Sequence, residues 1–209
     1  MKKAYPIQIY FLDNNLELSA QYQTNKSLSK SINGCIQALL ATRFYFIGIR
    51  NKKYYKYYFD KLRYDETMDR FFPLWPIKQK PSFIQYMSKE SKWTRKCAEH
   101  YNFIKNYLDI LFCEYLYRFG KDHKSHKIIE WLDFDAPKIN IPCANLKQIT
   151  LPWKVINIRC RRKNIIDGYR LQFMKTLDGN PMEAYLKTKR DIPEFVEKFF
   201  NLQNEKYLI

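Results

Sequence analysis

Apolar residues recur at spacings of three and four along most of this chain, which is typical of helices that bury one face. The clearest pattern covers residues 99–119, with apolar side chains at positions 104, 107, 108, 111, 112, 115 and 119. A second pattern begins at Ser27 or Ser31 and continues through Phe44. Strand signals are few, and residues 7–12 form the main one. The sequence therefore predicts a mainly α fold with a short N-terminal extended segment.

Shorter helices complete the expected fold. They are predicted at residues 16–22, 125–132, 165–177 and 182–187, and from Pro193, which suits a first helical turn, through Phe200. We expect one helical domain over residues 1–209, interrupted by an insertion at about 45–90. Prolines punctuate this insertion, but it is too aromatic to be disordered.

Residues 52–58 of the insertion read Lys-Lys-Tyr-Tyr-Lys-Tyr-Tyr. In one interpretation, exposed tyrosines stack on unpaired bases while the lysines neutralise the backbone. In the other, half of these rings belong to the core of a half-buried strand or helix. The aromatic stretch at 50–80 is also an alternative docking surface for a protein partner.

The 99–119 helix is predicted to end at Gly120, because glycine readily adopts the left-handed conformation that terminates helices. A basic turn follows directly. Lys121 and Lys124 lie where the helix dipole favours cations. His123 lies between these lysines, and His126 follows them. This arrangement indicates an anion-binding tip, and the alternative is a solvated helix end. The His-x-x-His spacing lacks the cysteine or carboxylate of a zinc pattern, so we expect no metal and no cofactor.

The formal net charge is +16, from 37 Lys and Arg against 21 Asp and Glu. Such an excess is compensated most simply by a polyanion, and nucleic acid is the leading candidate. No basic amphipathic segment or apolar run of membrane-spanning length is present, so no membrane partner is expected. Five cysteines without a CxxC pair, in a chain without a signal peptide, favour an intracellular protein that is not secreted.

Three blocks of the chain carry a family resemblance. The central line CEYLYRFGKDHKSHKIIEWL resembles a family of small phage proteins described as pyrimidine-dimer DNA glycosylase-like. The opening IQIYFLDNNLELSAQY and the closing blocks Tyr169-Arg170 and KTKRDIPEF, at 187–195, resemble that family in the same order. The resemblance covers about two-thirds of the chain and leaves 45–90 unmatched. It implies a helical DNA-binding architecture, a phage or viral origin with a place in the host cytoplasm or nucleus, and base excision on damaged or modified DNA.

The chain also departs from the family pattern. A His-Cys-Asp-Lys-His-Val block in the family is Gln-Thr-Asn-Lys-Ser-Leu here, at 23–28, so only Lys26 survives. The family tryptophan of Trp-Thr-Lys-Arg is Lys187. The better-understood phage enzymes use a free N-terminal amine with a nearby glutamate. Here Lys2 is too bulky for routine removal of Met1, and no glutamate adjoins Tyr22.

The candidate catalytic residues are Glu114 and His123. Base excision needs a carboxylate to stabilise an oxocarbenium-like sugar or to activate water. The alternative for Glu114 is an ion pair with Arg118, one turn further along the helix. Glu99 with His100 is a second pair, in which Glu99 more often serves the helix dipole.

The candidate nucleic-acid-binding residues are cations of the basic turn and of a dense run at 159–163, together with residues that the family resemblance adds near the C-terminus. The set is Arg118, Lys121, Lys124, His126, Arg159, Arg161, Arg162, Tyr169, Arg170, Lys189 and Arg190.

Two main hypotheses remain open. In the first, the protein is a DNA glycosylase or lyase that extrudes a base from the duplex. In the second, it is a catalytically degenerate relative that keeps a basic face and acts as a viral DNA-associated, host-factor-binding or assembly protein. Both expect the surplus cations to gather on one helical face. The first also expects Glu114, His123 and Lys124 to line one concave pocket.

Overall fold

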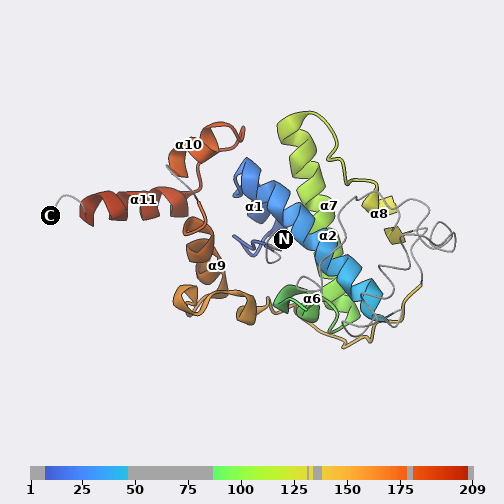
Figure 1. The fold of residues 1–209 in the computed structure, drawn as a ribbon. Helices are drawn as coiled ribbons and strands as arrows, with labels where there is room; N and C mark the ends of the chain where they lie inside the picture. Colours follow the sequence, from blue (N-terminus) through green and yellow to red (C-terminus); the bar gives the residue numbers. More distant parts are fainter. Residues whose placement is uncertain (1–7, 47–86, 131, 134–137, 178–180, 207–209) are drawn as a thin grey trace, which may run out of the picture.

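The computed structural model describes residues 8–46, 87–130, 132–133, 138–177 and 181–206 (Figure 1). Helices account for all the regular secondary structure in these ranges, so the predicted mainly α fold is confirmed. The predicted insertion at 45–90, with its tyrosine–lysine stretch, lies almost entirely outside the described residues.

The helices follow one another with short connections. Their bounds are α1 Leu16–Gln21, α2 Asn25–Phe46, α6 Lys89–Thr94, α7 Ala98–Phe119, α8 Ile128–Glu130, α9 Ile165–Met174, α10 Pro181–Leu186 and α11 Glu194–Lys206. Two 3₁₀ turns, η2 Trp153–Val155 and η3 Ile158–Cys160, precede α9. The predicted helix at 125–132 is therefore much shorter than expected, whereas the other helices lie close to their predicted positions.

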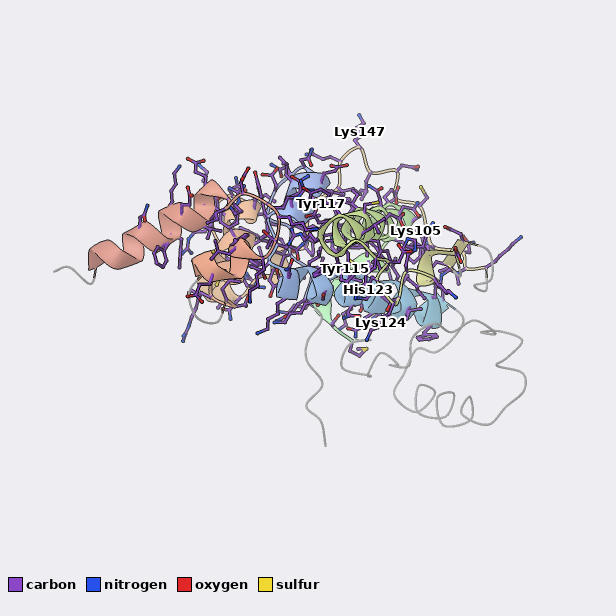
Figure 2. The ribbon with its side chains drawn as sticks, turned by 90° about the horizontal axis from the view of Figure 1, so that it is seen from above. Lys105, Tyr115, Tyr117, His123, Lys124 and Lys147 are labelled. Carbon is purple, nitrogen blue, oxygen red and sulfur yellow. The ribbon has the colours of Figure 1, made fainter. Side chains whose placement is uncertain are left out.

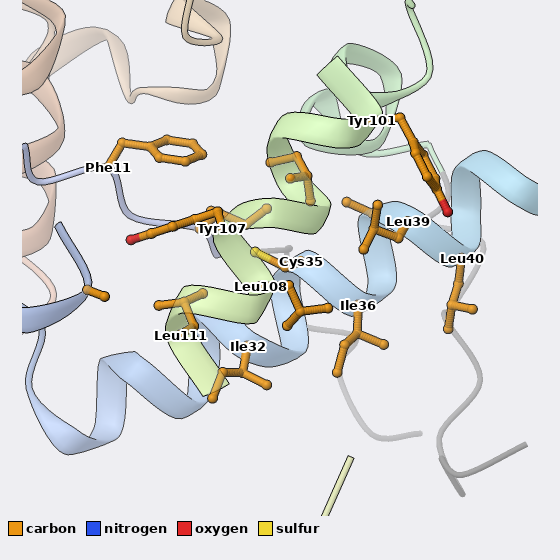
Figure 3. Packing of buried hydrophobic residues seen from close by; sticks show 14 of the residues in the cluster. Phe11, Ile32, Cys35, Ile36, Leu39, Leu40, Tyr101, Tyr107, Leu108 and Leu111 are labelled. Atoms are coloured by element: carbon orange, nitrogen blue, oxygen red, sulfur yellow. The ribbon is translucent and has the colours of Figure 1, made fainter. Parts of the chain in front are cut away.

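The main core forms where α2 and α7, each 22 residues long, pack together (Figure 3). Ile32, Ile36 and Leu39 of α2 meet the apolar stripe of α7, on which Leu108 and Leu111 are completely buried. Because most of the stabilising free energy of a helix in a protein comes from burying such a face, these two helices form the scaffold of the molecule.

Residues 8–12 are extended but form no strand, so the predicted strand at 7–12 is corrected over the described residues. Side chains of neighbouring helices replace the partner strand. Tyr10 N donates to Ser31 Oγ at 3.4 Å, Leu12 N donates to Ser19 Oγ at 2.8 Å, and Tyr107 Oη donates to Tyr10 O at 2.7 Å. The extended segment lies so close to α2 that a Cβ at Gly34 would approach the Gln8 carbonyl oxygen to 2.5 Å.

The helix stop at Gly120 is confirmed. Gly120 adopts a left-handed conformation with φ 64° and donates its backbone N–H to Leu116 O at 2.8 Å. No atom lies within 4 Å of the position that a Cβ would occupy. Backbone conformation alone therefore favours glycine here.

A second, smaller core joins the C-terminal helices to the extended segment. Tyr10 and Leu12 pack with Phe173 of α9, Tyr185 of α10 and Val196 of α11. The hydroxyl of Tyr185 donates to Tyr22 O at 2.6 Å, which fixes α10 beside the end of α1. The C-terminal helices are thus held against the start of α2, where the candidate site lies.

Candidate nucleic-acid interface

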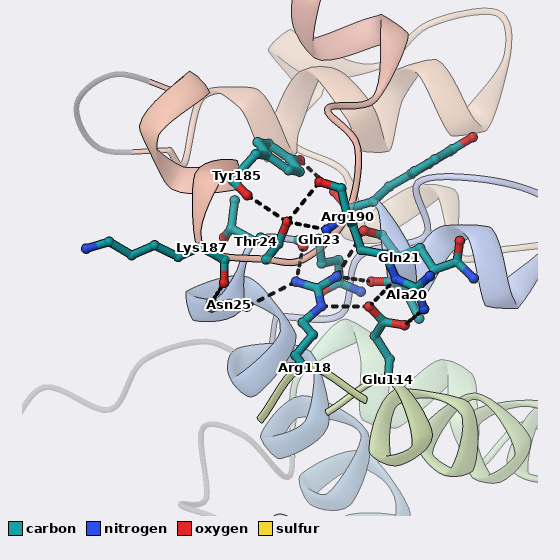
Figure 4. Close-up of polar contacts among 12 residues, drawn as sticks. Ala20, Gln21, Gln23, Thr24, Asn25, Glu114, Arg118, Tyr185, Lys187 and Arg190 are labelled. Carbon is teal, nitrogen blue, oxygen red and sulfur yellow. Dashed lines mark hydrogen bonds and ion pairs between the residues drawn. The ribbon is translucent and has the colours of Figure 1, made fainter. Parts of the chain in front are cut away.

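Arg118 lies in the last turn of α7 and is only 4% exposed. All five of its N–H groups are used within the protein (Figure 4). They donate to Glu114 Oε1 at 2.6 Å, Gln23 O at 2.7 Å, Gln21 O at 2.9 Å, Asn25 Oδ1 at 3.2 Å and Ala20 O at 3.3 Å. Arg118 therefore satisfies the carbonyl groups at the end of α1. It has no donor left for a phosphate, which corrects its assignment to nucleic-acid binding.

Glu114 is 5% exposed and is held by two arginines. Besides Arg118, it accepts from Arg190 Nε at 3.1 Å and from an Arg190 terminal nitrogen at 2.7 Å. The Arg190 guanidinium also lies over the Tyr117 ring, 4.0 Å from its centroid. The geometry supports the ion-pair alternative for Glu114 rather than the catalytic one, because both carboxylate oxygens already accept from guanidinium groups. We call Glu114, Arg118 and Arg190 the arginine–glutamate triad.

His123 is buried just beyond the end of α7. Its Nδ1 accepts from Ser125 N at 3.2 Å, and its ring packs edge-on against Tyr115 with centroids 4.8 Å apart. Burial, with the nearby charges of Lys124 and His126, lowers the pKa of His123 below its usual value. A neutral imidazole that accepts at Nδ1 holds the turn together, so the placement of His123 is structural and does not support its predicted catalytic role.

Among the described residues, Glu114, His123 and Lys124 do not line one concave pocket. Glu114 borders a small cavity of about 190 Å³ with Tyr117 and Arg190, and neither His123 nor Lys124 is among its described lining residues. In Figure 2, His123 and Lys124 lie near Tyr115 on one side of α7, and Lys147 projects on the other side. Lys121, Lys124 and His126 are exposed and form an open basic turn.

Tyr169 and Arg170 connect α9 to the extended segment. Tyr169 is completely buried, and its hydroxyl lies 3.4 Å from Pro152 O. Arg170 donates to Leu12 O at 2.7 Å and pairs with Asp13 at 3.0 Å. Tyr169 thus has no surface to offer a nucleic acid, and its assignment to nucleic-acid binding is corrected. Arg170 is half-buried and largely committed to the fold.

Arg159, Arg161 and Arg162 form a separate basic group around η3. Arg159 and Arg162 are exposed, whereas Arg161 is partly buried and donates to Ile156 O at 3.3 Å. The neighbouring turn η2 contacts α6, which directly precedes α7, while the basic turn follows the far end of α7 (Figure 1). The two groups therefore lie toward opposite ends of α7. The expectation that the cations gather on one helical face is corrected.

Glu99 and His100, the second predicted pair, also have structural contacts. The Glu99 carboxylate accepts from Ala144 N at 3.1 Å and Leu146 N at 3.2 Å. The backbone N–H of Glu99 itself, followed by that of Ala144, holds the pKa of the Glu99 carboxyl well below its usual range. His100 stacks on Trp93 with ring centroids 4.0 Å apart, and burial lowers its pKa. The pair anchors the loop around residue 144 and the turn after α6.

A cavity of about 690 Å³ was missed from sequence. It lies between the first turns of α2, the end of α9 and α10, and three lysines line it: Lys26, Lys30 and Lys187. Glu183 is the only acidic residue among its described lining residues. We call it the α2–α10 cavity.

A partial signal for this cavity was present in the sequence. Lys26 and Lys30 are four residues apart around the predicted helix start at Ser27 or Ser31, and Lys26 is the one residue of the block at 23–28 that matches the pattern of the family that the chain resembles. Lys189 and Arg190 follow Lys187 in the turn after α10. There the buried Thr188 hydroxyl accepts from Arg190 N at 3.2 Å and leaves Lys189 exposed with φ 57°.

The chain matches no family model, no curated protein and no solved structure. The family resemblance therefore stays a prediction.

The described residues include neither a candidate membrane span nor a candidate metal cluster. They contain no helix that is both long enough and apolar enough to cross a bilayer. They also contain no group of three or more His, Cys, Asp and Glu side chains placed to hold a metal ion.

Proposed function

We propose that this protein binds nucleic acid, and DNA in particular, as a module that performs no base excision. The observation that carries the proposal is the cluster of Lys26, Lys30 and Lys187 around one cavity of a chain whose formal net charge is +16. Lysine is a common phosphate ligand because its ammonium group is a compact charge with three donors. DNA is favoured over other polyanions by the family resemblance.

The basic turn supports the proposal as a secondary contact. Lys121, Lys124 and His126 are exposed beyond the end of α7, close in the chain to Arg118, which touches Asn25 at the start of α2. The α2–α10 cavity and the basic turn therefore belong to the same end of the α2–α7 pair. The group around η3 lies at the other end and would contact a different part of a bound strand.

The non-catalytic part of the proposal rests on the arginine–glutamate triad. A general acid or a stabilising carboxylate must turn an oxygen toward the reacting sugar. Both oxygens of Glu114 already accept hydrogen bonds from arginines. The buried ring of His123 offers no replacement.

Salt dependence tests the binding. The affinity for a short DNA duplex should fall steeply between 50 and 200 mM salt, since each neutralised phosphate contributes about 0.9 to the log–log slope. The variant Lys26→Ala/Lys30→Ala/Lys187→Ala should lower that slope by roughly two units. The control Lys154→Ala/Arg159→Ala/Arg162→Ala removes the same charge at the other end and should lower it less. Affinity that is flat with salt would contradict nucleic-acid binding.

Borohydride trapping tests the absence of excision chemistry. The N-terminal amine that the resemblance implies as a nucleophile lies outside the described residues. Incubation with oligonucleotides that carry abasic, dimer or modified-base sites should give neither a covalent adduct nor strand scission. A trapped adduct would instead favour the glycosylase or lyase hypothesis.

A further inference from the structure

The geometry points to the α2–α10 cavity as a site for a phosphate monoester of nucleotide size, which is the chemistry of a strand's terminal phosphate and of a free mononucleotide. If the ligand is the terminal phosphate of a strand, the site deepens the proposed nucleic-acid binding and rests on it. If the ligand is a free mononucleotide, the site does not depend on the proposed function. It differs from contact with internal phosphodiesters, which any exposed cation provides.

Charge is the first argument. Lys30 and Lys187 bring two ammonium groups without an ion-pair partner among the described residues, against one glutamate, Glu183, in the described lining. A phosphate monoester carries between about 1.5 and 2 negative charges at neutral pH, whereas an internal phosphodiester carries one. The cavity therefore complements the doubly charged group better than the singly charged one.

The placement of the lysines is the second argument. Lys30 of α2 and Lys187, which follows α10, line the cavity from two elements that lie far apart in the sequence. Neither Lys30 nor Lys187 has an ion-pair partner among the residues that the structure describes. In Figure 4, the Lys187 side chain points away from the arginine–glutamate triad. An anion between the Lys30 and Lys187 ammonium groups would supply the counter-charge that the described residues do not provide.

The start of α2 adds to the positive field. This 22-residue helix has no acidic residue in its first turn, so no side chain there offsets the positive end of its dipole. Thr24 precedes the helix and satisfies two of its amides, with Ser27 N at 3.3 Å from the Thr24 hydroxyl and Leu28 N at 2.8 Å from the Thr24 carbonyl. The dipole therefore supplements the lysines and does not replace them.

The rest of the cavity determines selectivity. Its size falls within the range of small-ligand pockets, and Leu177, Ala184 and Leu186 supply an apolar wall on which Leu186 is 77% exposed. Among the described lining residues the one aromatic is Tyr10, which is only 2% exposed and so offers no face for stacking a base. We expect the site to recognise the number of charges on the phosphate and to discriminate poorly between bases.

A competition experiment tests the inference on the full chain. The probes are a single-stranded oligonucleotide with a terminal phosphate at its 5′ or 3′ end, the same oligonucleotide with hydroxyl ends, and adenosine monophosphate. At least one terminal phosphate should strengthen binding by roughly tenfold, since hydrogen bonds to charged groups are worth about that factor each. Adenosine monophosphate should compete with the phosphorylated oligonucleotide and adenosine should not.

The variant Lys30→Ala/Lys187→Ala should abolish the preference for phosphorylated ends, whereas Arg159→Ala/Arg162→Ala should weaken both oligonucleotides equally. Thermal unfolding checks that each variant is folded, and Lys30→Gln/Lys187→Gln repeats the test if the alanine variant is not. Equal, salt-dependent affinity for the phosphorylated oligonucleotide and for the one with hydroxyl ends would overturn the monoester site and leave nucleic-acid binding standing. Binding of the mononucleotide without either oligonucleotide would support the site and overturn strand binding. Binding of none of the probes would overturn both.

Discussion

Two neighbouring groups of cations in this molecule are used in opposite ways. Both arginines of the triad pair with Glu114, whereas Lys30 and Lys187 in the α2–α10 cavity have no acidic partner among the described residues. Asn25 touches both groups, since its Oδ1 accepts from Arg118 at 3.2 Å and its Nδ2 donates to Lys187 O at 2.8 Å. A high net charge therefore does not indicate which cations bind a ligand. Burial and hydrogen-bond saturation separate the two uses.

The choice of residue type follows the same division. The planar arginine guanidinium donates in a fixed fork, which suits several carbonyl groups and a carboxylate at once. The cavity uses lysines, whose flexible stems allow a point charge to meet a ligand. The buried triad is thus a structural connection among α1, α7 and the turn after α10, and it holds one wall of the neighbouring cavity in place.

The largest expected effect comes from breaking the triad at its most buried member. Arg118→Met should lower the free energy of unfolding by about 3–5 kcal/mol, because it leaves the carbonyls at the end of α1 unpaired and removes a buried partner of Glu114. Urea denaturation of the variant measures this loss. Lys121→Ala, an exposed cation three residues further along, is the control and should change stability by less than about 0.5 kcal/mol. An equal loss of unfolding free energy in the two variants would contradict the distinction between cations that are hydrogen-bonded within the fold and cations that are exposed.

A smaller loss is expected at Arg190, which is half-buried and shares Glu114 with Arg118. Arg190→Ala should cost about 1–3 kcal/mol, since Glu114 keeps one partner. The variant should also loosen the turn at 187–190, which amide hydrogen exchange would detect as faster exchange at residues 188–190. The double variant Glu114→Gln/Arg190→Ala is the matched control. If the double variant is as stable as Arg190→Ala, the charge on Glu114 does not couple α7 to the turn after α10.

The long helices and their stop were predictable because the information is local. The apolar stripe of α7 repeats over six turns, and Gly120 ends it through its own backbone preference. The role of Arg118 was not predictable, because the carbonyls that it satisfies lie more than 90 residues away in the chain. The same holds for the cavity, where Lys30 and Lys187 meet only after α10 packs beside α2. The strand prediction failed because the hydroxyls of Ser19 and Ser31 replaced a partner strand.

The buried imidazole of His123 should make the stability of the protein depend on pH. Since burial lowers the pKa of His123 in the folded state, the unfolded chain binds more protons between that lowered value and about 6.5. Stability should therefore be highest above about pH 6.5 and should decrease as the pH falls through this window. Urea midpoints measured from pH 5 to pH 8 on the protein and on His123→Gln would isolate the contribution of His123. The slope should be shallower in the variant, and an unchanged slope would assign the pH dependence to other groups such as His100.

The smallest effect on stability is expected in the cavity, where the largest effect on binding should occur. Lys30→Ala and Lys187→Ala remove side chains that make no ion pair with the described residues, so each should change the free energy of unfolding by less than about 0.5 kcal/mol. Thermal unfolding with and without adenosine monophosphate provides the measurement. The ligand should raise the melting temperature of the protein and leave that of the double variant unchanged, since a ligand stabilises only a folded state that binds it. A marked destabilisation by either single substitution would show that these lysines, like Arg118, are held by the fold.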